Sequence, residues 1–181
     1  MKKIISIFFF VLVASTLKAQ NPFHYELGIS NFKGILFPQN VLALSGCVRY
    51  NIHEKNIEKS TSISLIPSFG VSSNNVLAVS VPFTFDFNYG CGSTSSSEKK
   101  VGAFMGAGLG YYNAFYTTRS FNSYHSTTGL IFHAGIRAKL NQHALTFRTN
   151  ILFSAVSYKM MSNDIGPYSP IVYGASLFYA F

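Results

Sequence analysis

Charged residues are scarce in this chain of 181 residues. They make up 11% of the sequence, whereas a soluble domain typically has about 25%. Tryptophan is absent and only two cysteines occur, yet aromatic residues reach 16% and the mean hydropathy is positive at +0.24. This composition excludes intrinsic disorder and a coiled coil, and the length leaves room for one domain.

The formal net charge of +8 does not indicate a nucleic-acid-binding surface. Lys2, Lys3 and Lys18 lie in an N-terminal segment that we expect to be removed, which leaves 11 basic and 6 acidic residues and a charge of +5. So few charges form no dense basic patch. We therefore expect no nucleic acid among the partners.

The first 19 residues have the layout of a secretory signal peptide. Lys2 and Lys3 provide a positive start, residues 4–17 form an apolar run, and Ala19 is a small residue at a suitable cleavage point. The run is shorter than the ~20 residues that a membrane-spanning helix needs. We expect cleavage after Ala19, which leaves residues 20–181 as one domain outside the cytoplasm. A retained N-terminal anchor helix is the alternative.

Beyond residue 20 no apolar run approaches the roughly 18 residues of a helical span. Apolar residues instead alternate with small or polar ones, which is typical of β-strands with two different faces. Clusters of Gly, Ser, Asn and Pro separate the alternating segments, as turns require. The pattern predicts eight strands, in residues 25–32, 42–52, 62–71, 76–89, 101–112, 129–140, 144–155 and 171–181.

The charged residues of these segments all lie on the face opposite the apolar one. The side chains of the apolar face are larger in total than the inside of a closed eight-stranded barrel could hold, whereas the other face is mostly Gly, Ser, Ala and Asn. We therefore expect the apolar face to meet lipid and the charges to pair inside a narrow lumen. The expected lumen charges are Glu26, Arg49, Asp86, Arg137, Lys139 and Arg148.

A lipid bilayer accepts such strands only as a closed barrel, because backbone N–H and C=O groups in hydrocarbon have no water to bond. Eight strands of about 10 residues suit an outer-membrane barrel. The sequence therefore predicts an all-β fold, an eight-stranded antiparallel up-and-down transmembrane β-barrel.

Tyrosines on the apolar face occur near the ends of the expected strands. With the N-terminus in the periplasm, Tyr111 and Tyr173 lie near the outer rim. Amphipathic rings at both membrane interfaces form the aromatic girdles of such barrels, although scattered core tyrosines are the alternative interpretation. The periplasmic members of the girdle are Tyr25, Tyr50, Tyr89 and Tyr179.

The chain ends in an alternating segment, residues 176–181, with Phe181 last and Tyr179 two positions before it. This ending resembles the C-terminal signature of Gram-negative outer-membrane β-barrels, and the whole mature chain resembles their small eight-stranded class, that of the OmpA transmembrane domain and OmpX. The resemblance implies that the barrel-assembly machinery recognises Tyr179 and Phe181. It also implies contact with outer-membrane lipid and lipopolysaccharide, and exposed loops. It implies no single activity, because members include anchors, adhesins and lipid-modifying enzymes.

Catalytic chemistry is not evident in the sequence. His125 and Ser126 are adjacent in a Ser-rich segment without an acidic residue to orient the histidine, and His133 fits a hydrogen-bonding role in the lumen better than that of a base. No Cys/His spacing suggests a metal, and no cofactor is expected. We expect no disulfide between Cys47 and Cys91, because they lie on strands that are not neighbours, although a compartment outside the cytoplasm permits one.

Two expected outer loops, residues 115–126 and 157–170, mix aromatic and hydroxyl side chains with few charges. Such surfaces suit a ligand such as a glycan, lipopolysaccharide or another protein, although the loops could merely cap the barrel. We expect a structural or surface-interaction protein. A lipid-modifying enzyme of the lipid A deacylase or acyltransferase kind is the first alternative, and a narrow pore is the second.

Some local features fit the pattern less well. Pro67 and Pro82 fall inside neighbouring strands, where each removes a hydrogen-bond donor, so we expect a bulge there. The turns at residues 51–60 and 90–98 are longer than a periplasmic hairpin needs. A tight two-residue connection is expected at Gln142 and His143.

Overall fold

The computed structural model describes residues 22–34, 37–72, 76–117, 122–141, 143–161, 164–167 and 171–180. The expected signal peptide and Phe181 lie outside the described residues. Within the described ranges, no helix has the length and apolar character to cross a membrane.

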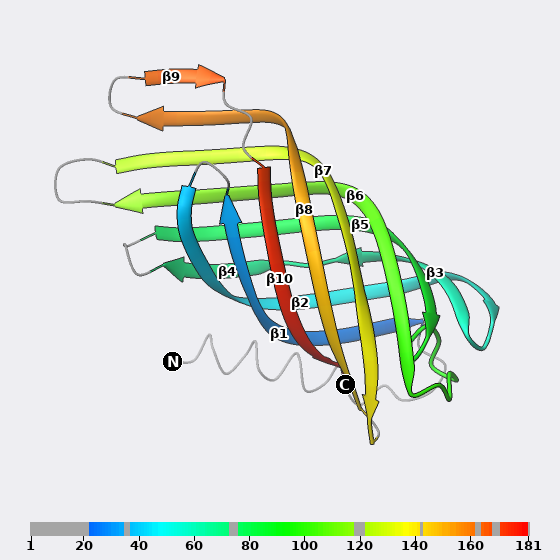
Figure 1. Cartoon of the computed structure of the whole chain (residues 1–181). Helices are drawn as coiled ribbons and strands as arrows, with labels where there is room; N and C mark the ends of the chain where they lie inside the picture. Colours follow the sequence, from blue (N-terminus) through cyan, green and yellow to red (C-terminus); the bar gives the residue numbers. More distant parts are fainter. Residues whose placement is uncertain are drawn as a thin grey trace, which may run out of the picture.

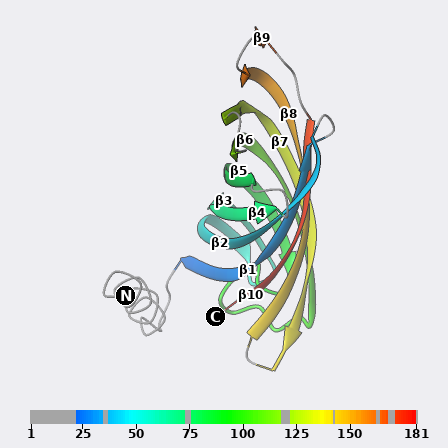
Figure 2. The ribbon, with the colours of Figure 1, turned by 90° about the vertical axis from the view of Figure 1, so that its left-hand side faces the viewer.

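The described residues form antiparallel β-strands that close into a ring of eight positions (Figure 1). β3 and β4 together occupy one position, and β9 pairs only with the end of β8. The ring closes because β1 pairs with β2 on one side and with β10 on the other, and Figure 2 shows β1 and β10 side by side. The predicted eight-stranded up-and-down barrel is confirmed. The strands are β1 (Phe23–Gly34), β2 (Phe37–Asn56), β3 (Lys59–Leu65), β4 (Ser68–Ser72), β5 (Val76–Gly90), β6 (Val101–Thr117), β7 (Asn122–Leu140), β8 (His143–Met161), β9 (Asp164–Pro167) and β10 (Ile171–Ala180).

The strands are staggered around the ring. A path of directly opposed residues starts at Phe23 in β1, passes once around the barrel and returns to β1 at Lys33, ten residues farther along the strand. Such a stagger tilts the strands against the barrel axis. The residues on the path between these two ends are Tyr50, Ile63, Phe85, Ala107, Phe132, Ile151 and Tyr173.

The apolar face of the strands points outward. Phe83, Phe85 and Phe147 are 50%, 44% and 46% exposed, whereas Arg49 and Arg148 are only 1% exposed. In a protein that folds in water alone, the large apolar side chains would be the buried ones. The predicted orientation, with apolar residues outside and charges inside, is confirmed.

The interior divides into two halves along the barrel axis. We call the end where β1 begins and β10 finishes the terminal end, and the opposite end the far end. The half nearer the far end is filled by an apolar cluster, and the half nearer the terminal end, which we call the polar half, holds the buried charges together with a smaller apolar group, Cys47, Ile66 and Phe178. The apolar cluster consists of Phe32, Val41, Ala43, Val76, Ala78, Tyr112, Ala114, Ile131, Leu152 and Val172.

A layer of serine hydroxyls separates the two halves. Ser30 contacts Ser45 and Ser176, and Ser45 contacts Ser68, with Oγ···Oγ distances of 2.6, 2.7 and 2.7 Å. These side chains come from β1, β2, β4 and β10, so the layer links four neighbouring strands. Each buried hydroxyl in it has a partner, as burial of a polar group requires.

The two prolines do not produce the expected bulge, and that prediction is wrong. The register of β5 against β3 continues against β4 without a shift, and only the ladder is interrupted between β3 and β4. The carbonyl oxygens of the two prolines still accept hydrogen bonds: Ile66 N–H donates to Pro82 O at 3.0 Å, and Gly46 N–H donates to Pro67 O at 2.9 Å. The missing proline N–H groups therefore break the strand without displacing it.

The strands extend farther toward the far end than the sequence predicts. β6 continues to Thr117 and β7 begins at Asn122. β8 continues to Met161, and its end pairs with β9. Much of the expected loops 115–126 and 157–170 is therefore paired strand, and those boundaries are wrong. The alternation is lost there because neither face of a strand beyond the apolar band has to meet lipid.

The connections at the terminal end also differ from the expectations. The expected long turn at residues 51–60 is a short hairpin between Asn56 and Lys59, in which Glu58 N–H donates to Asn56 Oδ1 at 3.0 Å. The tight connection between β7 and β8 lies one residue earlier than predicted, because Leu140 pairs with His143. The segment after Gly90 is long, as expected.

Candidate functional site

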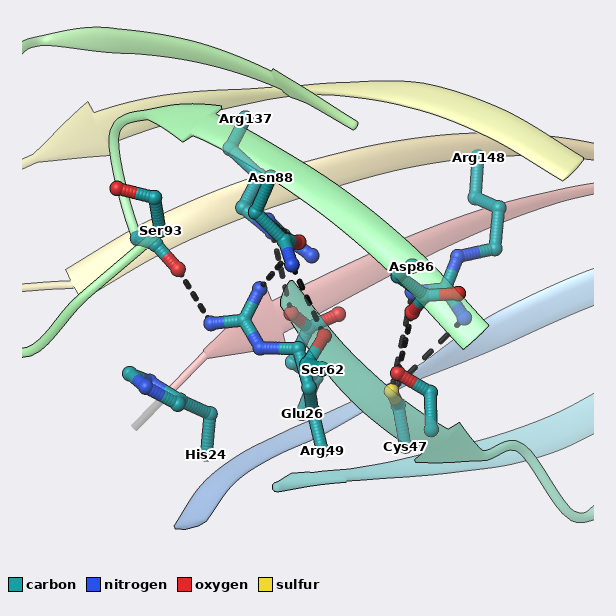
Figure 3. A network of polar contacts seen from close by, with 12 residues as sticks. His24, Glu26, Cys47, Arg49, Ser62, Asp86, Asn88, Ser93, Arg137 and Arg148 are labelled. Carbon is teal, nitrogen blue, oxygen red and sulfur yellow. Dashed lines mark hydrogen bonds and ion pairs between the residues drawn. The ribbon is translucent and has the colours of Figure 1, made fainter. Parts of the chain in front are cut away.

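Five buried charges from five strands gather in the polar half of the lumen (Figure 3). Alternation places each on the inward face of its strand. They are Glu26 on β1, Arg49 on β2, Asp86 on β5, Arg137 on β7 and Arg148 on β8. The structure thus brings together five of the six residues that the sequence assigned to the lumen.

Lys139 is not part of this cluster, so its assignment to the lumen is wrong. It lies on the same face of β7 as Arg137, but its side chain is exposed near the end of the strand. Its backbone N–H donates to Lys100 O at 2.7 Å, which places it at the terminal rim of the barrel. Alternation fixes the face of a residue but not its height along the barrel axis.

Asn88 joins two of the arginines. Arg49 Nη1 and Arg137 Nη1 donate to Asn88 Oδ1 at 3.1 and 3.0 Å, and Asn88 Nδ2 donates to Ser62 Oγ at 2.9 Å. Arg137 Nε also lies 3.4 Å from Glu26 Oε1. The sequence analysis did not single out Asn88, although it lies on the charged face of its strand.

Asp86 lies between a histidine and a serine. Its Oδ1 is 2.7 Å from His133 Nε2, and its Oδ2 accepts a hydrogen bond from Ser64 Oγ. In a serine hydrolase the histidine stands between the serine and the acid, so that it can take the hydroxyl proton. Here the acid stands in the middle, which is not the order of that relay. His133 is thus a hydrogen-bonding residue of the lumen.

Arg148 is surrounded by polarisable groups. Both of its Nη atoms lie 3.8 Å from Cys47 Sγ, and its Cζ lies 4.9 Å from the Phe104 ring centroid and 5.3 Å from that of Phe178. Arg137 Cζ lies 4.2 Å from the centroid of the Phe104 ring. Cation–π contacts of this kind stabilise guanidinium groups away from water.

The cluster holds three arginines against two carboxylates, and several of its polar atoms have no protein partner. Arg49 Nε, Arg137 Nη2, Arg148 Nε and Glu26 Oε2 are buried without a hydrogen bond to protein. Buried water commonly fills such positions. In the part of the chain that the structure describes, no group of His, Cys, Asp or Glu could hold a metal ion.

The segment that follows β5 folds inward and contacts the polar cluster at the terminal end of the lumen. We call residues 91–97 the plug turn. Arg49 Nη2 donates to Gly92 O, and Ser93 O accepts hydrogen bonds from Asn51 Nδ2 at 2.9 Å and from Ser60 Oγ at 2.5 Å. Ser93 is fully buried. The sequence showed only that this turn is long, whereas the structure shows that it folds into the barrel.

The two cysteines are both buried and both free. Cys47 points into the lumen beside Arg148, and Cys91 lies at the start of the plug turn.

The expected girdle tyrosines lie on the outward face at the two ends of the barrel. At the terminal end the Tyr50 ring lies 5.0 Å from the Phe23 ring, and Tyr179 lies 5.0 Å from the His143 ring. At the far end Asn113 Nδ2 donates to the Tyr111 hydroxyl at 2.8 Å. Tyr50, Tyr89, Tyr173 and Tyr179 are exposed, and Tyr25 and Tyr111 are half-buried.

The remaining sequence-based candidates are the expected assembly signal, Tyr179 and Phe181, and the expected loop residue His125. Tyr179 of the expected assembly signal is on β10, directly opposite Leu27 and Leu145, whereas Phe181 lies outside the described residues. His125 lies within strand β7 and is buried, so its assignment to a loop is wrong.

Comparisons with known proteins agree with this geometry. No protein-family model and no curated protein matches the chain. Solved structures similar to this chain include that of Neisserial surface protein A, with a TM-score of 0.52 and 11% identity over 87% of this chain and 94% of that one. They also include Ail, the attachment invasion locus protein of Yersinia pestis, with a TM-score of 0.51 and 11% identity over 90% of this chain and 100% of that one. The chain has the fold of these small β-barrels. The resemblance inferred from the C-terminal ending is therefore confirmed at the level of the fold.

A third structure, the N-terminal β-barrel domain of Pseudomonas aeruginosa OprF, matches with a TM-score of 0.48 and 10% identity over 89% of this chain and 98% of that domain.

Proposed function

We propose that the chain is an integral outer-membrane β-barrel protein with a structural or surface-interaction role. The observation that carries the proposal is the apolar belt, the outward-facing apolar residues that every strand of the ring contributes. An exposed apolar surface far larger than the few hundred Å² usual on soluble monomers marks contact with a membrane or a partner. A belt that surrounds the whole barrel fits a bilayer, which contacts every strand at once.

The terminal end faces the periplasm in this proposal. An expected signal peptide precedes β1. Of the three connections at that end, β2 to β3 and β7 to β8 are short hairpins, and the third, residues 91–100, folds inward. Short periplasmic turns and longer extracellular segments are typical of outer-membrane barrels. Barrel assembly through the C-terminal motif, with Tyr179 and Phe181, belongs to the proposal, as do contacts with outer-membrane lipid and lipopolysaccharide.

The far end would then present the two extended hairpins, β6–β7 and β8–β9, at the cell surface. Phe115 and Val156 are exposed on these hairpins, beyond the segments predicted from alternation. One of the similar proteins is named as a surface protein and the other as an attachment and invasion protein. Both names support a surface-interaction role, which we assign to residues 115–126 and 157–170 because of their place at the far end.

Catalysis and conduction are not part of the proposal. The Asp86-centred contacts lack the order of a nucleophilic relay. The plug turn at one end of the lumen and the apolar cluster in the other half oppose passage of ions. These contacts support a non-enzymatic and non-conducting barrel.

Epitope insertion in intact cells tests location and orientation together. A short tag between residues 119 and 120 should be labelled by antibody on intact cells, because it extends the β6–β7 hairpin outward. The matched insertion directly after Asn141, in the β7–β8 connection, should be labelled only after the cells are opened. The proposal would be contradicted if the protein is in the outer-membrane fraction but neither tag is labelled. It would also be contradicted if the tag after Asn141 is labelled on intact cells and the tag between residues 119 and 120 only on opened cells. Heat-modifiable migration on a detergent gel reports barrel folding of each insertion protein.

A further inference from the structure

Two lysines lie over one exposed aromatic ring at the terminal end. Lys99 Nζ is 4.5 Å and Lys59 Nζ is 5.8 Å from the ring centroid of Tyr89. Lys59 and Tyr89 are directly opposed on β3 and β5. Lys99 Nζ also donates to the Tyr89 hydroxyl at 2.7 Å. Both ammonium groups are therefore held beside the same ring, at the edge of the apolar belt.

The surrounding rim carries an excess of positive charge. Lys100 and Lys139 are both exposed. The backbone N–H of Lys139, on β7, donates to the backbone O of Lys100, just before β6. Glu58 pairs with Lys99 at 2.9 Å, and Glu98 is exposed nearby in sequence. With Lys55 and Glu54, which are exposed in the β2–β3 hairpin beside Lys59, five lysines thus face three glutamates along this part of the rim. Hydrogen bonds from Lys99 to Tyr89 and to Glu58 raise the pKa of its amine, so the group stays charged at neutral pH.

A column of exposed phenylalanines continues from Tyr89 along β5 toward the far end. Phe87, Phe85 and Phe83 all point outward, and the rings of Phe85 and Phe87 meet edge to face at 5.3 Å. On the adjacent β6, Ala103 and Ala107 lie opposite Tyr89 and Phe85, and they alternate with exposed Met105 and Leu109 opposite Phe87 and Phe83. The two strands together give an acyl chain a continuous apolar surface along which it can lie.

We propose that this surface binds an anionic phospholipid. Its phosphate contacts Lys59 and Lys99, displacing Glu58 from Lys99, and an acyl chain lies along the phenylalanines of β5. The inference rests on the proposed function, because only a barrel in a bilayer meets the headgroup and the chains at these two heights. The positive rim selects a lipid with net negative charge over a zwitterionic lipid of the same chains.

Native mass spectrometry of the purified full chain tests the selectivity. The detergent-solubilised protein is mixed with equal amounts of dioleoyl phosphatidylglycerol and dioleoyl phosphatidylethanolamine, and the lipid-bound species are counted. The wild type should retain phosphatidylglycerol in clear excess. A Lys59→Gln/Lys99→Gln variant should lose roughly 30-fold in phosphatidylglycerol retention, as expected for removing two interfacial cations, with little change for phosphatidylethanolamine.

Two further variants make the result specific. Lys33→Gln/Lys159→Gln removes the same charge from the far-end parts of β1 and β8, away from Tyr89, and should leave the preference unchanged. Lys59→Arg/Lys99→Arg should retain it, because the cations remain. Equal retention of the two lipids by the wild type, or the same loss in both glutamine variants, would overturn the site.

Heat-modifiable migration and insertion into phosphatidylcholine vesicles separate this inference from the function on which it rests. A protein that inserts normally but shows no lipid preference contradicts the lipid site alone. A protein that fails to insert contradicts both.

Discussion

His133 Nε2 lies 2.7 Å from Asp86 Oδ1 inside the lumen, and both side chains are fully buried. Gly106 lies directly beside this pair, and a Cβ at Gly106 would overlap both Asp86 Oδ1 and His133 Nε2. The pair therefore depends on the absence of a side chain at this one position of β6.

Gly106→Ala should destabilise the barrel by about 2–3 kcal/mol, because the added methyl group pushes apart a buried hydrogen-bonded pair. The free energy of unfolding is measured by urea titration in lipid vesicles. Gly46→Ala is the matched control, since its Cβ would meet only Leu27 Cδ2 and Glu26 O at ordinary contact distances of 3.8 and 4.0 Å. Equal effects of the two substitutions would contradict the described packing.

Removing one lumen carboxylate should be costly. Glu26→Gln leaves three buried arginines with Asp86 as the remaining carboxylate of the cluster, so we expect a loss of about 3 kcal/mol in the free energy of unfolding. Lys139→Gln also removes a charge that alternation assigned to the lumen, but its side chain is exposed at the rim. It should change stability by less than about 0.5 kcal/mol. A comparable loss for Lys139→Gln would place it back inside the barrel.

Cys91 should react slowly with maleimide in the folded protein. It is buried in the plug turn, and burial raises the pKa of its thiol, so less of the reactive thiolate is present at neutral pH. Reaction should become fast after denaturation. A Cys91→Ser/Ser96→Cys variant provides the control, because Ser96 is exposed in the same turn and its cysteine should label without denaturation. Rapid labelling of Cys91 in the folded wild type would show that the plug turn does not fold into the barrel.

The wild-type protein should not conduct ions in planar bilayers. Replacing residues 91–98 with Asn-Gly removes the acceptors of Asn51 and Ser60, and we expect lower stability from their loss. The shortened protein should still be closed, because the apolar cluster around Ile131 and Leu152 remains. Steady single-channel currents from the wild type would refute the closed lumen.

Alternation alone was enough to predict the ring of strands and the direction of their faces. Contact with lipid requires an apolar side chain at every second position, so Phe83 and Phe85 reveal which side of β5 faces outward. The same rule placed Arg49 and Arg148 inside. The outer parts of β6, β7 and β8 were missed because no such requirement acts beyond the apolar belt.

The interior contacts were less accessible to sequence reasoning. Alternation does not report where a residue lies along the barrel axis, which is why Lys139 was assigned to the lumen. It also does not report how a turn folds, so the long segment after Gly90 gave no sign that Ser93 would bond to Asn51. One signal was present for Phe104: a large ring on the inward face of β6, with glycines on either side along that face, has to fill the lumen.

The most direct test of the membrane proposal compares Leu44→Arg with Ile57→Arg. Leu44 is 70% exposed in the middle of β2, and Ile57 is 59% exposed in the hairpin between β2 and β3. In a bilayer, arginine at Leu44 should cost about 2–4 kcal/mol of unfolding free energy, whereas arginine at Ile57 should cost about 0–1 kcal/mol. The free energies are measured by reversible unfolding from lipid vesicles. If Leu44→Arg proves neutral, as it would be for a side chain facing water, the apolar belt does not contact lipid and the membrane proposal is wrong.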